Sequence, residues 1–171
     1  VADLTFTQST SARQANSLDI TFASIDGSGG VLAQAYLPAD VNSGRSAGDI
    51  EFDLADPWEI GNGRGSLAFD FVYVAAHEIG HAMGMPHEHQ NPKAGIVWDE
   101  PKVISAYSGP PNNWNEAKIR HNVLRKLPLT GISAGSEWDP RSIMHYRIIP
   151  GLIKAPTPAT AGASGMRASA A

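Results

Sequence analysis

Three histidines, a glutamate and a glycine that could act together lie between positions 77 and 87 of this 171-residue chain. His77 and His81 are four residues apart, so on a helix their imidazoles point the same way. Gly84 allows a sharp turn that can bring His87 back as a third ligand. Three imidazoles leave one coordination position of a zinc ion open for water, as catalytic zinc sites do. Glu78, about 100° from His77 around the helix, can then take a proton from that water.

A helix must carry this cluster, and the sequence predicts one. Apolar side chains recur at helical spacing from Val72 to Met83, Ser66 or Asp70 can cap the start, and Gly84 can end the helix. Before it, glycine-rich turns separate four expected strands, at residues 4–7, 18–23, 31–37 and 49–54. After it, frequent prolines predict a loop-rich stretch with one further helix over residues 114–127.

The pattern His-Glu-x-x-His-x-x-Gly-x-x-His over residues 77–87 resembles the zinc-binding stretch of the metzincin metallopeptidases. Residues 142–146, Ser-Ile-Met-His-Tyr, resemble the Met-turn of these enzymes in its astacin form. The resemblance implies that Met144 supports the ligands and that Tyr146 is a further zinc ligand, able to leave the metal and donate a hydrogen bond to an oxyanion. It implies an α+β metzincin-type zincin, with a twisted mixed β-sheet, an active-site helix and a loop-rich C-terminal subdomain.

The first half of the chain resembles another metzincin branch, the matrixins. Residues 26–36, 48–53 and 56–58 are similar to the matrixin metal-binding loop and the segment that completes it. Matrixins bind a structural zinc through histidines where this chain has Gln34 and Glu51, so we expect that zinc to be absent. Oxygen ligands suit Ca²⁺. The acidic residues of this loop therefore either bind calcium or form a solvated acidic turn, and the sequence does not choose between the two. The calcium ligands that the resemblance implies are Asp26, Gly27, Gly29, Val31, Asp53 and Asp56.

Residues around these motifs extend the resemblance. Residues 87–92, 108–114 and 138–141 are similar to microbial astacin-like enzymes, and Glu88 fits the glutamate of that family. We expect His89 and His145 beside the metal ligands and His121 at the surface. Arg147 either points inward, where it would favour an acidic residue after the cleaved bond, or points to solvent, which we favour.

Composition excludes several other classes of protein. The chain has no cysteine, which rules out disulfides, Cys-ligated metals and a thiol nucleophile. Its net charge of −4 argues against a nucleic-acid partner, and no apolar run approaches the roughly 20 residues that a membrane span needs. We expect a catalytic domain over residues 1–154 and an Ala/Gly/Ser/Pro-rich segment over 155–171. Compared with metzincins, the chain starts after their first strand and long helix, or residues 8–17 stand in for that helix.

The sequence therefore predicts a secreted, monomeric zinc endopeptidase with a catalytic Zn²⁺. Whether it also binds a structural Ca²⁺ is left open by the sequence. Peptide bonds would be hydrolysed by a zinc-activated water, with Glu78 as general base and Tyr146 as oxyanion stabiliser. A protein or peptide substrate would bind in extended form along a sheet edge, for which we expect the segment before the active-site helix. Two alternatives stay open: a non-catalytic zincin-like binding module, and a latent peptidase that needs processing.

Overall fold

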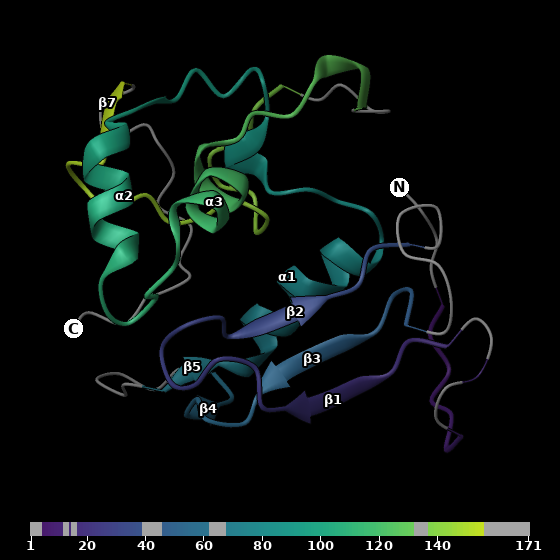
Figure 1. Cartoon of the computed structure of the whole chain (residues 1–171). Coiled ribbons are helices and arrows are strands. Elements are labelled where there is room, and N and C mark those ends of the chain that lie inside the picture. The colour runs from purple at the N-terminus through teal and green to yellow at the C-terminus, as the bar shows by residue number, and fades with distance from the viewer. Residues whose placement is uncertain are drawn as a thin grey trace.

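The computed structural model describes residues 5–11, 14, 17–38, 46–61, 68–131 and 137–155 (Figure 1). Its main sheet has three strands: β1 (Ile20–Ala23), β2 (Ala33–Ala35) and β3 (Ile50–Asp53). Their order is β1-β3-β2, with β1 parallel and β2 antiparallel to β3, so the sheet is mixed as predicted. Three of the four expected strands are therefore confirmed, each shorter than the apolar pattern suggested.

The expected strand at residues 4–7 is wrong for the part that the structure describes. Residues 5–10 are exposed and belong to no strand, and residue 4 lies outside the described residues. Alternation of apolar and polar residues stabilises a strand only where one face is buried, and this segment buries neither face.

The helix predicted to carry His77 and His81, α1 (Phe71–Ala82), is present. Its cap is Asp70, whose carboxylate accepts hydrogen bonds from the backbone N–H groups of Val72 and Tyr73. Its end is fixed by Gly84, which has φ of +86° and so takes a left-handed conformation that favours glycine. The short parallel pair β4 (Trp58–Glu59) and β5 (Phe69–Asp70) leads into the helix.

The sheet and α1 share one apolar core. Ile50 and Phe52 of β3 are fully buried and lie two residues apart, so their side chains point to the same face of the sheet. On that face they pack with Val74 of α1, which is 3% exposed. Phe71 at the start of α1 lies 4.6 Å from Phe52, centroid to centroid. This packing fixes the helix that carries His77 and His81 against the sheet.

The second half contains short elements joined by loops. They are η1 (Glu88–Gln90), β6 (Val97–Trp98), α2 (Glu100–Ser108), α3 (Glu116–Ile119), the π-helical η2 (Arg120–Leu124), η3 (Leu129–Gly131) and β7 (Ile153–Ala155). The predicted helix over 114–127 is shorter than expected and starts at Glu116, because the Asn115 side chain caps it by accepting from Lys118 N. Helix α2 was not predicted. Its Pro101 lies in the first helical turn, where a missing N–H costs little.

The second half has an apolar core of its own, and a residue next to β2 packs against this core. Val103 of α2, Ile119 of α3 and Val123 of η2 are almost fully buried in one cluster. Val31, two residues before β2, packs against that cluster. None of the helices in the described part of the chain has the length and apolar character needed to cross a membrane. Residues 156–171 lie outside the described residues, so the boundary expected at 154 stays a prediction.

Candidate active site

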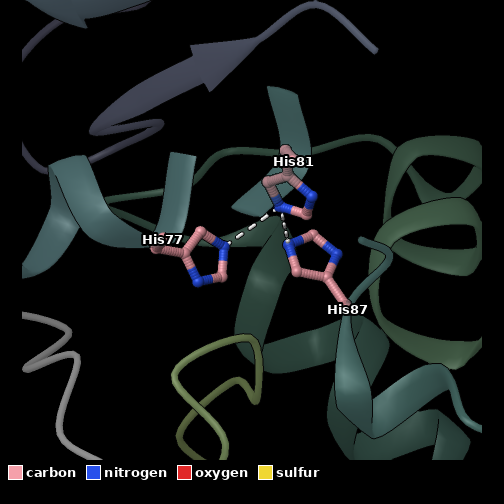
Figure 2. Close-up of side chains that lie close together, drawn as sticks. All are labelled: His77, His81 and His87. Atoms are coloured by element: carbon pink, nitrogen blue, oxygen red, sulfur yellow. Dashed lines mark hydrogen bonds between the residues drawn. The ribbon is translucent and has the colours of Figure 1, made fainter. Parts of the chain in front are cut away.

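The three histidines predicted as metal ligands converge on one point (Figure 2). His81 Nε2 lies 3.1 Å from His77 Nε2 and 3.0 Å from His87 Nε2. The first two side chains come from successive turns of α1, and the turn at Gly84 returns the chain so that His87 completes the set. Within the described residues, this is the one group of three or more His, Cys, Asp or Glu side chains with ligand atoms all within 4.8 Å of one another.

The outer nitrogens of two rings fix their tautomers. His77 Nδ1 lies 2.8 Å from the carbonyl oxygen of Ile143, and His81 Nδ1 lies 2.8 Å from that of Met85. A carbonyl oxygen only accepts, so each Nδ1 donates its proton and each Nε2 directs a lone pair into the cluster. Burial lowers the pKa of His77 to about 4, despite the Ile143 hydrogen bond, so its ring is neutral near pH 7.

This donor set fits zinc. Lone pairs that face each other at about 3 Å repel, and a cation between them turns repulsion into attraction. Nitrogen ligands at about 2.0–2.1 Å in tetrahedral geometry lie about 3.3 Å apart, close to the 3.0 and 3.1 Å found here. Neutral imidazoles are ordinary zinc ligands, and three of them leave a coordination position free.

Glu78 lies beside the cluster on α1 and is 6% exposed. Burial raises the pKa of its carboxyl group to about 7. A carboxyl group with a pKa near the working pH exchanges a proton readily in both directions. Glu78 is thus a buried carboxyl group with a raised pKa, next in sequence to the first histidine.

The Met-turn lies against the C-terminal half of α1. A Cβ atom on Gly80 would overlap the sulfur of Met144, which is 4% exposed, so only glycine allows this close approach. Two hydrogen bonds attach the turn to the ligand segments: His77 Nδ1 to Ile143 O, and Glu88 N to Met144 O at 2.9 Å. The turn is thus bonded to the first histidine and to the residue after the third, and the supporting role of Met144 itself stays a prediction.

Tyr146 packs on the third ligand. Its ring centroid lies 4.2 Å from that of His87 and 6.4 Å from that of His77. Burial raises the pKa of the Tyr146 phenol, and the charge of Glu78 and the phenol of Tyr107 raise it further. The hydroxyl is therefore protonated at neutral pH in the metal-free protein and can donate a hydrogen bond.

Several neighbours of the ligands acquire contacts that the sequence alone did not indicate. His89 and His145 are each 1% exposed; the His89 ring stacks on Tyr146 and contacts His145, whereas His121 is exposed as expected. Glu88 Oε1 accepts hydrogen bonds from Asn91 Nδ2 at 2.9 Å and from the backbone N–H of Asp139 at 3.1 Å.

Two other residues complete this comparison with the sequence. Tyr107 was missed because the helix that carries it, α2, was not predicted, and no local motif marks it. Arg147 is exposed, consistent with the solvent-facing alternative.

The aspartates of the expected calcium loop are bound mainly by backbone N–H groups. Asp53 Oδ2 accepts from Asp26 N at 2.9 Å and Gly27 N at 3.0 Å, and its Oδ1 accepts from Ala55 N at 2.8 Å. Asp56 Oδ1 accepts from the N–H of Gly29 at 2.7 Å. The loop is thus ordered by its own hydrogen bonds.

Two further features concern metal binding near this loop. Asp26 Oδ1 accepts from the N–H of Val31 at 2.8 Å, while Asp56 Oδ2 is buried without a hydrogen-bond partner among the described residues. Gln34 Nε2 donates to Glu51 Oε2 at 2.7 Å, so the side chains at the expected structural-zinc positions bond to each other. The pair lies directly opposite across β2 and β3.

The mixed sheet, the helix with its histidines and the Met-turn beneath them define a metzincin-type zinc metallopeptidase domain, whose cofactor is a catalytic zinc. Comparison with known proteins supports this class. The solved structure of myroilysin superposes with a TM-score of 0.62 and 30% identity, covering 80% of this chain and 61% of that chain.

The family follows from the sequence comparisons. The matrixin family model matches residues 1–97, more than half of the chain, and the chain belongs to the matrixin family. Stromelysin-3 of Xenopus laevis is 38% identical over 93 residues, covering 51% of this chain. Karilysin of Tannerella forsythia is 41% identical over 73 residues, covering 43% of this chain. The chain spans 18% and 14% of the length of these two relatives, respectively.

Proposed function

We propose that this protein is a zinc-dependent endopeptidase whose metal is held by His77, His81 and His87. The observation that carries the proposal is the convergence of three Nε2 atoms at 3.0–3.1 Å, two of them with protons fixed on the opposite nitrogen. When bound, zinc supplies Lewis acidity, polarising a peptide carbonyl and lowering the pKa of a water molecule.

Glu78 is the general base in this proposal. Its carboxylate takes a proton from the attacking water and then delivers that proton to the leaving amine. Burial supports both steps, because it raises the pKa of the Glu78 carboxyl group to about 7. At neutral pH a group with this pKa can both accept and release a proton.

Tyr146 is the second catalytic residue and a further zinc ligand in the resting enzyme. Its phenol donates a hydrogen bond to the oxyanion that forms when the carbonyl is attacked. The raised pKa supports this role, since a phenol that keeps its proton can donate it. The domain would then combine a matrixin-like first half with an astacin-like Met-turn.

The substrate would bind as an added strand on β2. Leu32 O accepts from Asp53 N of β3 at 2.8 Å, and Tyr36 N donates to the carbonyl oxygen of Asp49, just before β3, at 2.9 Å. Backbone groups alternate along a strand, so those of Ala33 and Ala35 face away from β3 and can pair with an extended peptide. We therefore move the expected substrate edge from the segment before α1, where β4 and β5 pair with each other, to β2.

The remaining expectations concern the wider protein. We propose that it acts on protein or peptide substrates outside the cell as a monomer, with no nucleic-acid or membrane partner. Asp56 Oδ2, which is buried without a hydrogen-bond partner in the described part of the chain, supports a structural calcium at the loop formed by Asp26, Gly27, Gly29, Val31, Asp53 and Asp56.

Replacement of Glu78 by Gln tests the mechanism. The variant should keep zinc and lose activity by about 10²–10⁴-fold, because the amide cannot accept the proton. The measurement is cleavage of a peptide mixture, followed by mass spectrometry, beside zinc content per chain. Glu116→Gln, at an exposed glutamate paired with Arg120, is the matched control and should leave cleavage unchanged.

The same assay separates the alternatives. Undiminished cleavage by zinc-loaded Glu78→Gln would refute the role of Glu78. A zinc-loaded wild-type protein that cuts nothing, both as isolated and after limited proteolysis, would instead identify a non-catalytic module. Cleavage that appears only after limited proteolysis would identify a latent peptidase.

A further inference from the structure

His89 lies at the centre of the aromatic cluster around Tyr146, and the mechanism above gives it no role. Its ring stacks on that of Tyr146, with centroids 4.5 Å apart and planes inclined by 23°. The rings of His87 and Trp98 lie on other sides of His89, at 5.3 and 6.2 Å. Offset stacking at this distance is a favourable aromatic contact.

The His89 ring is itself fixed from a distant part of the chain. The residue is 1% exposed, and its Nε2 lies 3.0 Å from the carbonyl oxygen of Asn122 in η2. Because a carbonyl only accepts, Nε2 carries the proton and donates it. The neighbouring Gln90 also donates to η2, to His121 O at 2.8 Å. The stacking face of His89 is thus held by a segment about thirty residues further along.

Tyr146 depends on such contacts for its orientation. Among the residues that the structure describes, none forms a hydrogen bond with the Tyr146 hydroxyl, so ring packing sets the direction of this side chain. His87 contacts the ring at 4.2 Å with an angle of 55°. His89 stacks on it at 4.5 Å and 23°, whereas the other near-parallel ring, that of His77 at 29°, lies farther away at 6.4 Å. The backbone is held separately, by a hydrogen bond between His145 Nδ1 and Tyr146 O at 2.6 Å.

We propose that His89 is a positioning residue that holds the Tyr146 ring in the orientation from which its hydroxyl reaches the metal and the oxyanion. The inference rests on the function proposed for Tyr146. A flat stacking surface constrains the tilt of the phenol while letting it slide within its plane. A hydrogen bond to the hydroxyl would instead have to break each time the phenol changed partners.

Two substitutions separate the stacking face from the hydrogen bond. His89→Phe keeps an aromatic face and loses the donor to Asn122, whereas His89→Leu fills the space without a face. We expect His89→Leu to lower kcat about fivefold with little change in KM, and His89→Phe to restore most of the rate. His121→Leu, at an exposed histidine nearby, is the control and should change neither constant.

A double-mutant cycle with Tyr146→Phe distinguishes positioning from general support. If His89 acts through the phenol, His89→Leu should cost no further rate once the hydroxyl is gone. An equal loss in both backgrounds, or equal rates for His89→Leu and His89→Phe, would overturn the proposal. A wild-type rate for Tyr146→Phe alone would instead refute the function proposed for Tyr146.

A spectroscopic measurement gives the same answer without activity. In protein loaded with Cu²⁺ in place of zinc, a coordinated Tyr146 phenolate gives a visible charge-transfer absorption. We expect His89→Leu to weaken or shift this band at unchanged copper content, and His89→Phe to retain it. An unaltered band in His89→Leu would contradict the proposal. Thermal unfolding of each variant identifies any that fail to fold, and His89→Met then replaces His89→Leu as the variant without an aromatic face.

Discussion

The loop over residues 26–31 and the histidine cluster are both partly buried polar sites, yet their hydrogen bonding differs. In the loop, donors meet acceptors: Asp53 alone accepts three backbone N–H groups. In the cluster, acceptors meet acceptors, since the Nε2 lone pairs of His77 and His81 face each other at 3.1 Å. Most polar groups of the loop therefore have partners without a bound ion, whereas the lone pairs of the cluster are satisfied only when a cation binds between them.

This difference predicts a large effect of zinc removal on stability. Zinc that binds the folded but not the unfolded protein stabilises the folded state by about 4 kcal/mol when the free zinc concentration is about a thousand times the dissociation constant. Chelation should therefore lower the free energy of unfolding by about that amount, measured by urea denaturation, and restored zinc should reverse the loss. Equal stability of the zinc-free and zinc-loaded proteins would show that the cluster is complete by itself.

The second prediction concerns the carboxylate that organises the loop. Asp53→Ala leaves three backbone N–H groups without their acceptor and should cost about 3 kcal/mol of unfolding free energy. Asp53→Asn keeps one acceptor oxygen and should cost less. Urea midpoints of the two variants check this order. The reverse order would mean that the hydrogen bonds to Asp53 do not hold the loop.

The same carboxylate gives a pH dependence with a defined sign. Burial alone would raise the pKa of Asp53, but the backbone N–H groups of Ala55, Asp26 and Gly27 outweigh it, and the pKa is lowered. Its contribution to stability is therefore fully present above the unfolded pKa of about 4 and is lost as the pH falls through the lower native value. Asp53→Asn should show a weaker loss of stability over that acidic range than the wild type.

Calcium should have the smallest effect. Most carboxylate oxygens of the loop already accept backbone N–H groups, and Asp56 Oδ2 is the buried one without a partner in the described residues. Millimolar Ca²⁺ should therefore raise the free energy of unfolding by less than about 1 kcal/mol relative to a calcium-free sample. A gain as large as that from zinc would remove the contrast between the two sites.

The sequence predicted most successfully where contacts are local. Spacing placed His77 and His81 on one helix, and Asp70, one of the two caps that the sequence offered, begins it. Helix α2 was missed because Pro101 reads as a helix breaker, although in the first turn it is tolerated.

Contacts between distant segments could not be predicted in this way. The hydrogen bond between His89 and Asn122 and the close approach of Met144 to Gly80 depend on tertiary packing. Residue spacing does not encode such contacts, and only the resemblance at residues 142–146 pointed to Met144 beside the ligands. The acidic loop residues suggested cation ligands, but the sequence could not show that backbone N–H groups occupy most of their oxygens.

The central claim is that three imidazoles bind one catalytic zinc. X-ray absorption at the zinc edge, combined with metal analysis of the purified protein, tests it most directly. We predict one zinc per chain with three nitrogen ligands at about 2.0–2.1 Å, and loss of this site in His81→Ala. Full zinc occupancy in His81→Ala with an unchanged spectrum would contradict the account.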